Sequence, residues 1–226
     1  MRSPRPDDGA DDIARHALVT AGIKLAAGGF VVGSAGNLSC RQGDLVVISA
    51  TGAELGTMTI ADTVVVDLAG RRVAGSRRPS SELPLHLGIY NGRRSEVGAV
   101  AHAHAIASTA VSCVVRNQLP ALHYACLQLG GPPRIAPYAT FGTDQLATNV
   151  QEALGDDRSA ALMQNHGSLA VGSTLAEAIA HLELLEWLCQ LHQAAHRLGR
   201  PRVLGPDELR RASEALATRQ QQIDLA

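Results

Sequence analysis

The sequence lacks the features that would assign it to several broad classes of protein. No apolar run approaches the roughly 20 residues that a membrane-spanning helix requires. The formal net charge is −1, with 20 Lys and Arg against 21 Asp and Glu, so no basic excess points to a nucleic-acid partner. We therefore predict neither a membrane protein nor a nucleic-acid-binding protein.

Cysteine is scarce, and its positions are scattered. Cys40, Cys113, Cys126 and Cys189 show no paired spacing, which argues against a thiol-rich metal site or a disulfide framework. Reduced thiols fit the cytosol. Residues 1–12 hold prolines and acids rather than the apolar core of a signal peptide. We predict a cytoplasmic protein with a flexible N-terminal lead-in over residues 1–10.

The apolar fraction, in contrast, is large. Of the 226 residues, 46% are hydrophobic, which is enough for a sizeable core. No internal repeat or long linker divides the chain, so we predict a single domain over residues 11–226. Expected helices cover 11–27, 79–90, 106–115, 144–154, 175–198 and 206–222. Expected strands cover 45–48, 63–68, 71–74, 97–105 and 160–171. Residues 119–124 are expected to form an extended connection, and residues 135–143 a loop.

Two histidines stand two residues apart in a run of small, apolar residues. His102 and His104 flank Ala103 within residues 97–105. If this run is a strand, alternate side chains point to the same face, and both imidazoles project side by side. Neutral imidazole is the commonest protein ligand for a zinc-class metal, so this pair would form half of a metal site. A pair of buried, hydrogen-bonded histidines fits the same pattern.

Two short polar segments have the composition of an anion site. They are Gly36-Asn37, in a glycine-rich loop, and Ser80-Ser81, at the start of a predicted helix. Glycine and asparagine favour backbone angles that expose amide groups, and a helix N-terminus offers free N–H groups to a phosphate. An ordinary turn would give the first segment the same composition, and Thr51-Gly52 forms a second small polar loop.

Three further titratable residues admit a purely structural role. Glu82 lies in the first turn of the helix predicted over 79–90, where an acid complements the helix dipole. His86 lies one turn further on, and we expect it to be solvated or a partner to the helix. His166 comes where a predicted strand breaks at a glycine, and a lone histidine there is usually structural.

Seven short motifs occur in the order found in a known family. They are Gly36-Asn37-Leu38-Ser39, Thr51-Gly52, Ser80-Ser81-Glu82, His102-Ala103-His104, His123-Tyr124, Tyr138-Ala139-Thr140-Phe141-Gly142-Thr143 and Asn165-His166-Gly167. On these motifs the chain resembles the aldolase/adducin-head family, and the resemblance covers roughly residues 10–200. Within that family it is most similar to the class II aldolases that act on L-fuculose-type sugar phosphates. The resemblance implies an α/β fold, a three-layer α/β/α sandwich with a central, mostly antiparallel β-sheet. It also implies a homotetramer with sites at subunit interfaces.

The same resemblance implies a role for particular residues. One Zn²⁺ per subunit would be held by His102, His104, His166 and Glu82, with Glu82 also acting as the catalytic acid/base. Tyr124 would reach the neighbouring subunit's site as a second catalytic residue and proton donor. The phosphate of a phosphorylated keto-sugar substrate would be held by Gly36, Asn37, Thr51, Gly52, Ser80 and Ser81.

The implied activity is the reversible, zinc-dependent cleavage of a ketose 1-phosphate to dihydroxyacetone phosphate and an aldehyde. The implied substrate is similar to L-fuculose 1-phosphate. Cleavage leaves a carbanion beside a carbonyl, and zinc would spread that charge as an enediolate. Glu82 would then shuttle the proton at that carbon.

Related activities in the same family stay open. They are a 5-deoxypentulose-phosphate aldolase, a pentulose-phosphate 4-epimerase, a methylthioribulose-phosphate dehydratase and a keto-acid phosphate decarboxylase. Such epimerases usually carry aspartate in place of Glu82, and the decarboxylases tend to carry threonine and lysine in place of Ser80-Ser81, so this sequence favours an aldolase. An adducin-type interaction module should have lost the metal histidines, which are present here. The C-terminal segment 213–226 has no tyrosine or phenylalanine, which leaves open how the site closes and which aldehyde it accepts.

Overall fold

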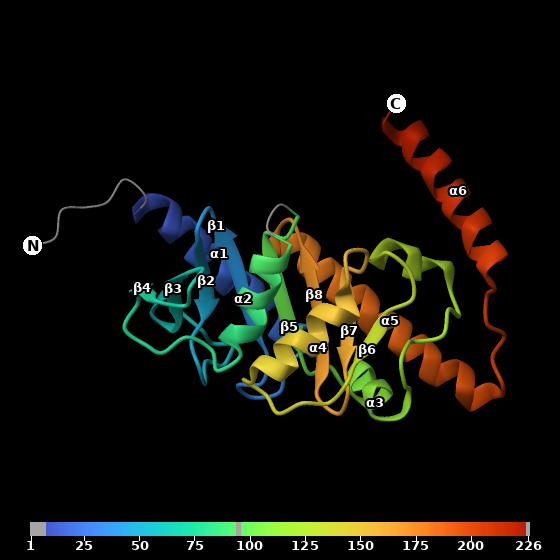
Figure 1. Cartoon of the computed structure of the whole chain (residues 1–226), viewed down its shortest axis with the longest axis horizontal. Helices are drawn as coiled ribbons and strands as arrows, with labels where there is room; N and C mark the ends of the chain where they lie inside the picture. Colours follow the sequence, from blue (N-terminus) through green and yellow to red (C-terminus); the bar gives the residue numbers. More distant parts are fainter. Residues whose placement is uncertain (1–7, 94–95, 225–226) are drawn as a thin grey trace, which may run out of the picture.

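A computed structural model describes residues 8–93 and 96–224, which form one β-sheet with helices on both faces (Figure 1). The helices are α1 Asp8–Ala27, α2 Leu83–Gly92, α3 Ile106–Val114, α4 Asp144–Leu154, α5 Leu175–Leu198 and α6 Pro206–Asp224, with short 3-10 turns η1 Ile60–Asp62 and η2 Tyr124–Leu129. The strands are β1 Asn37–Gln42, β2 Leu45–Ser49, β3 Thr63–Asp67, β4 Arg72–Ala74, β5 Ala99–Ala103, β6 Arg134–Ala136, β7 Ala160–Met163 and β8 Gly167–Gly172. Each helix in this part of the chain is too short or too polar to span a bilayer.

The strands form an eight-stranded sheet in the order β4-β3-β2-β1-β5-β8-β7-β6. Neighbouring strands are antiparallel except β6 and β7, which run parallel. One apolar cluster joins α1, α3 and α5 to one face of the sheet, and a second joins α2 and α4 to the other. Figure 1 shows α6 extending away from these layers. The structure confirms the predicted three-layer α/β/α sandwich with a mostly antiparallel sheet.

The central strands are buried on both faces, with successive side chains pointing to opposite layers. In β2, Val46 and Ile48 lie in the cluster under α2 and α4, whereas Val47 lies in the cluster under α1 and α5. In β5, Val100 faces α2 and α4, and its alanine neighbours face the other layer. Because side chains alternate with a period of two, the next even-numbered residue, His102, shares the face of Val100.

Several predicted helices are confirmed closely. α5 spans the predicted residues 175–198, and α4 begins after Thr143, whose hydroxyl accepts the Leu146 N–H as a helix cap. α1 begins at Asp8, before the predicted start at residue 11. Residues 1–7 of the predicted lead-in lie outside the described residues, and the single domain over residues 11–226 stays a prediction.

The break predicted at the glycine within 160–171 is confirmed, and the run forms two strands, β7 and β8, because Asn165 has a left-handed backbone (φ 53°) and the chain reverses there. Two other predictions of local structure are wrong. The loop predicted over 135–143 begins inside strand β6. The helix predicted from residue 79 begins at Leu83 with Glu82 as its N-cap residue. The Ser80 hydroxyl accepts the Glu82 N–H just before that helix instead of capping it.

A buried carboxylate from α5 caps the N-terminus of α3. The Glu186 side chain accepts the N–H groups of Ala107 and Ser108 at 2.9 and 2.8 Å. Glu186→Ala leaves these buried donors without their acceptor, so we expect it to lower the free energy of unfolding by about 1–3 kcal/mol. Urea unfolding at fixed protein concentration measures this. The matched control is Glu183→Ala, a change on the same helix, α5, that removes only an exposed ion pair with Lys24 of α1. Equal unfolding midpoints for the two variants would contradict the capping role.

Candidate active site

Several loops meet at one end of the sheet because its central strands are antiparallel. Strand β5 ends where β1 and β8 begin, with Asn37 opposite His102 and Ala103 opposite Ser168. Strand β2 also ends here, and a bridge between Ala50 and residue 79 joins this end to the segment before α2. The segments that gather at this end are therefore 36–37, 50–52, 80–82, 102–104 and 165–167.

Three histidines form a cluster at this end of the sheet. The ligand nitrogen atoms of His102, His104 and His166 all lie within 4.8 Å of one another. The Nε2 atoms of His102 and His104 are 2.9 Å apart, and the ring of His166 lies edge-on to both. His102 is buried at the end of β5, whereas His104 and His166 are half-buried and face a cavity. The predicted side-by-side projection of His102 and His104 is confirmed.

Two close backbone approaches bring these loops together. A Cβ atom on Gly167 would lie 2.5 Å from the carbonyl oxygen of Ala103, and one on Gly36 would lie 2.9 Å from that of His102. Gly36 also has φ 98°, a conformation that favours glycine. The residues that follow Gly36 and precede Gly167 therefore lie directly against the two strand histidines.

The Glu82 carboxylate completes the cluster from the N-terminus of α2. Its Oε2 lies 3.1 Å from Nε2 of His102, and its Oε1 lies 3.5 Å from Nε2 of His166. Asn37 donates to Oε2 at 2.8 Å, but Oε1 is buried with no hydrogen-bond donor among the described residues. A buried carboxylate oxygen without a partner is costly unless something else occupies its lone pairs.

The residues present fit a divalent metal. Nδ1 of His102 lies 2.9 Å from the carbonyl oxygen of Ser168, so Nδ1 carries the proton in the neutral ring and Nε2 keeps its lone pair. Metal-binding histidines usually donate their second nitrogen in this way. Three imidazoles and one carboxylate are a donor set typical of zinc. The unpartnered Oε1 of Glu82 is directed at the same histidines.

The electrostatics of the cluster favour neutral outer histidines and an ionised carboxylate. Burial lowers the pKa of His104 and of His166 to about 4, and neighbouring His102 adds to this effect. Burial also lowers the pKa of His102, but the Glu82 carboxylate outweighs it and raises that pKa. Burial disfavours the ionised form of Glu82, yet His102 and the Asn37 hydrogen bond hold the Glu82 pKa well below its usual range.

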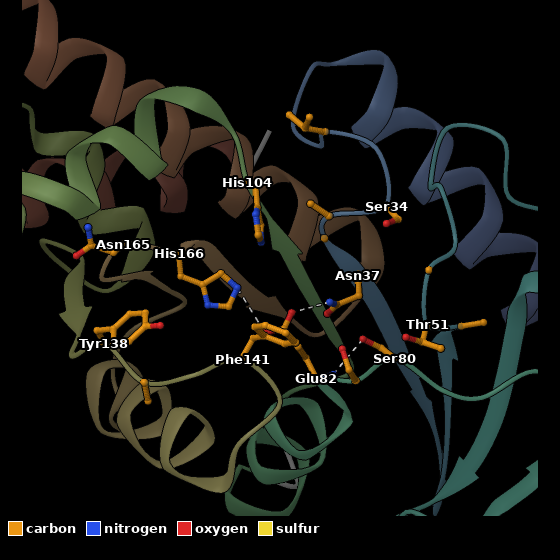
Figure 2. Close-up of a pocket in the computed structure, with 17 residues that line it drawn as sticks. Ser34, Asn37, Thr51, Ser80, Glu82, His104, Tyr138, Phe141, Asn165 and His166 are labelled. Atoms are coloured by element: carbon orange, nitrogen blue, oxygen red, sulfur yellow. Dashed lines mark hydrogen bonds and ion pairs between the residues drawn. The ribbon is translucent and has the colours of Figure 1, made fainter.

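A cavity of about 570 Å³ opens beside the cluster. Figure 2 shows Glu82 between His166 on one side and Ser80 and Thr51 on the other. Every residue predicted to hold a phosphate lines this cavity, namely Gly36, Asn37, Thr51, Gly52, Ser80 and Ser81. The structure thus brings the predicted metal ligands and the predicted anion segments to one space.

Other parts of the cavity wall were not predicted. Val32, Tyr138 and Phe141 line the cavity and are 74%, 62% and 65% exposed, which gives part of its mouth an apolar surface. Ser34 and Asn165 also line it. Figure 2 places Tyr138 and Asn165 on the side of His166, away from Ser80 and Thr51.

Tyr124, predicted to be catalytic, is not among the residues that line this cavity. It is 46% exposed at the start of η2, and its ring stacks on His123 with centroids 4.4 Å apart. The ring of His123 packs edge-on against Trp187. Tyr124 therefore belongs to an aromatic cluster with His123 and Trp187 at the surface of the chain.

His86 is the clearest residue whose surroundings were predicted wrongly. It was expected to be solvated or a partner to its helix, but its side chain is fully buried and contacts Asn37 and Ser39 on β1. The prediction failed because the face of α2 that carries His86 and Tyr90 packs on strand β1. Burial lowers the pKa of His86 to about 3, so its ring is neutral. Its spacing of four residues from Glu82 already indicated that the two residues share a helix face, and Tyr90 continues that spacing.

Comparisons with known proteins agree with this geometry. Residues 16–193 match the model of the family described as "Class II Aldolase and Adducin N-terminal domain". A 5-methylthioribulose-1-phosphate/5-deoxyribulose-1-phosphate aldolase of Rhodospirillum rubrum is 37% identical over 205 residues, which cover 90% of this chain and 91% of that protein. A 5-deoxy-D-ribulose 1-phosphate aldolase of Bacillus thuringiensis is 35% identical over 197 residues, which cover 86% of this chain and 91% of that protein. A solved L-fuculose 1-phosphate aldolase superposes with a TM-score of 0.84 at 34% identity, covering 91% of this chain and 96% of that one.

Proposed function

The chain belongs to the class II aldolase and adducin N-terminal domain family, and it is a lyase of the class II aldolase type, a metal-dependent class. We propose that it reversibly cleaves a ketose 1-phosphate. The proposed products are dihydroxyacetone phosphate and an aldehyde. One observation carries this proposal. Three histidines and an ionised carboxylate converge beside a cavity whose other wall holds the hydroxyls and glycines of an anion cradle.

The proposed cofactor is one Zn²⁺ per subunit, held by His102, His104, His166 and Glu82. A zinc ion bound there would supply Lewis-acid stabilisation of the negative charge that develops on substrate oxygen. The protein's part is to present neutral nitrogen lone pairs, which the hydrogen bond from His102 to the Ser168 carbonyl and the low pKa values of His104 and His166 favour.

Glu82 is the proposed proton carrier. In cleavage, the bond between carbons 3 and 4 breaks and its electrons stay on carbon 3. The carbon 4 hydroxyl passes its proton through the hydroxyl of Tyr124 from a neighbouring subunit to solvent as the aldehyde forms, and the Glu82 carboxylate takes up one proton from solvent. Carbon 3 must then gain a proton to give dihydroxyacetone phosphate. The Oε1 atom of Glu82 has no described hydrogen-bond partner and is the oxygen best able to hold that proton and deliver it.

The phosphate is proposed to lie on the opposite wall, where the three anion segments meet. Because hydrogen bonds to charged groups contribute about 1.5–3 kcal/mol, we expect Ser81→Ala to raise KM roughly 10- to 100-fold. Turnover at saturation should change little, because the contact is remote from the bond that breaks. Steady-state kinetics of cleavage measure both constants. Ser76→Ala, an exposed serine outside the cavity, is the control. A fall in kcat at unchanged KM would place Ser81 at the reacting end instead.

The distal end of the substrate is proposed to be apolar, as in a 5-deoxypentulose 1-phosphate. The exposed side chains of Val32, Tyr138 and Phe141 at the cavity mouth would suit a methyl or methylthio group better than a hydroxyl. The names of the Rhodospirillum and Bacillus relatives support the same substrate class. The structural similarity to an L-fuculose 1-phosphate aldolase supports a six-carbon substrate as the second candidate.

A substrate panel tests the proposed reaction. The zinc-loaded protein is incubated with the 1-phosphates of 5-deoxyribulose, 5-methylthioribulose and L-fuculose, and dihydroxyacetone phosphate is trapped by a coupled reductase. We expect the highest kcat/KM for one of the two five-carbon substrates. Release from L-fuculose 1-phosphate alone would contradict the apolar distal end. Consumption of these substrates without dihydroxyacetone phosphate would contradict cleavage and favour an epimerase, dehydratase or decarboxylase.

Tyr124 is proposed to act in the site of a neighbouring subunit within a homotetramer in the cytoplasm. Its exposure, and the fact that it does not line the cavity of its own chain, support this placement. We expect Tyr124→Phe to lower kcat about 10²-fold, the lower range for a lost proton donor, without changing the oligomeric state. Kinetics together with sedimentation measure both properties. His123→Phe, which keeps an aromatic ring beside Tyr124, is the control. A monomeric wild-type protein with full activity would contradict the shared site.

A further inference from the structure

A line of buried polar side chains runs behind Glu82, between α2 and β1. Asn37 donates to Oε2 of Glu82 at 2.8 Å, and Nε2 of His86 lies 2.5 Å from Oδ1 of Asn37. Nδ1 of His86 lies 2.6 Å from Oγ of Ser39, which lies 2.8 Å from the hydroxyl of Tyr90. His86, Ser39 and Tyr90 are fully buried, and Asn37 is 6% exposed.

The spacing of these residues explains why they meet. Glu82, His86 and Tyr90 follow one another at four-residue intervals, so they share a face of α2 and rise about 6 Å at each step. Asn37 and Ser39 are two residues apart on β1 and share a face, with a rise of about 6.6 Å. Because the two steps nearly match, the polar side chains of the helix interleave with those of the strand.

The hydrogen bonds in this line can run in only one direction. An ionised carboxylate only accepts, so Asn37 donates to Glu82 through Nδ2 and turns Oδ1 toward His86. Oδ1 needs a donor, so the neutral ring of His86 carries its proton on Nε2. Nδ1 of His86 is then an acceptor, so Ser39 donates to it and Tyr90 donates to Ser39. All four donors point toward Glu82.

Packing alone does not call for these polar groups. On the same helix, Leu85 and Ile89 pack into an apolar cluster against the sheet, so this interface accepts hydrocarbon side chains. Buried polar networks are often no more stabilising than apolar residues of similar volume, but they fix one geometry. A role in fixing the geometry of Glu82 accounts for the line.

We propose that His86, Ser39 and Tyr90 are positioning residues that lock the Asn37 amide with Nδ2 toward Glu82. The lock holds Oε2 of Glu82 and leaves Oε1 directed at the histidine cluster. The second N–H of the same amide remains for the cavity, which Asn37 also lines. Asn37 thus connects the anion cradle with the proposed proton carrier. This inference rests on the proposed function of Glu82.

Variants of His86 test the proposal by kinetics. His86→Leu removes the donor to Asn37, and we expect kcat to fall about 10- to 100-fold, the usual effect of losing a group that orients a metal ligand. KM should change less than kcat, because the variant leaves every residue of the phosphate cradle except Asn37 undisturbed. His86→Gln should recover much of kcat, because its amide N–H can take the place of the ring Nε2–H. Ile89→Val, a buried residue of the same helix, is the control, and it should lower Tm without changing kcat or KM.

A measurement independent of turnover tests the direction of the line. In ¹⁵N-histidine NMR spectra of the full-length wild type, we expect a set of signals typical of a neutral ring protonated at Nε2. The same set should be missing from the spectrum of His86→Leu. Protonation of this ring at Nδ1, or equal loss of kcat in His86→Leu and His86→Gln, would overturn the proposal. Unchanged kcat in His86→Leu would overturn it as well. If the wild type cleaves no sugar phosphate, the proposed function fails. The NMR result then decides by itself whether the hydrogen bonds from Tyr90 to Asn37 all donate toward Glu82.

Discussion

Glu82→Gln is expected to lower kcat by at least about 10²-fold, within the range that general acid–base groups contribute. Glutamine has nearly the same shape as glutamate and can still accept the Asn37 N–H, but its amide does not carry a proton to carbon at neutral pH. The loss should fall on turnover, because the three histidines and the anion segments are unaffected. Coupled detection of dihydroxyacetone phosphate gives kcat, and metal analysis with calorimetric titration of the product shows whether both ligands still bind.

The matched control for this variant is Glu54→Gln, which removes an exposed carboxylate that does not line the cavity. Its kcat should stay within about twofold of the wild type, as expected for a surface change. If Glu82→Gln keeps near-normal turnover, Glu82 has no part in proton transfer. If it loses zinc as well as turnover, the carboxylate matters chiefly as a ligand.

Removing the metal is expected to abolish activity, and adding zinc should restore it. In the proposed reaction, stabilisation of the charge released by carbon–carbon cleavage would depend on an ion held by the histidines. Dialysis against a chelator, followed by titration with Zn²⁺, should recover activity in proportion to bound metal up to one ion per subunit. Full activity in protein shown by elemental analysis to be metal-free would contradict this.

Single histidine variants separate the site from the fold. His166→Ala should lose bound zinc and activity, because it removes one ligand from a half-buried turn with little effect on packing. The control is His181→Ala, which removes a histidine outside the cluster whose ring contacts the Val171 carbonyl. This variant should keep one zinc ion per subunit. Equal zinc content in the two variants would contradict the assignment of His166 as a ligand.

Local sequence signals predicted the helices well because the information lies within each segment. Thr143 caps α4 through its own hydroxyl, and Gly199 follows the last residue of α5. The break at the glycine within 160–171 was also predicted, whereas the reversal at Asn165, whose left-handed backbone turns this run into two antiparallel strands, was not. Local reasoning failed at β6, which has only three residues and pairs in parallel with β7.

The site needed more than local patterns. The period of two along β5 predicted that His102 and His104 project together. It carries no information about His166 or Glu82, because their approach depends on the strand order β1-β5-β8 and on where α2 begins. Only the family resemblance named those two residues beforehand. His86 was mispredicted because its burial depends on strand β1, which lies more than forty residues earlier in the chain.

The central claim is that one divalent ion is held by three histidines together with the carboxylate that moves the proton. X-ray absorption at the zinc edge of the zinc-loaded protein tests it most directly, because the multiple-scattering signal counts imidazole ligands. We predict three imidazoles per zinc with oxygen completing the set, and two imidazoles in His166→Ala loaded with excess zinc. A wild-type spectrum with fewer than three imidazoles would contradict the account.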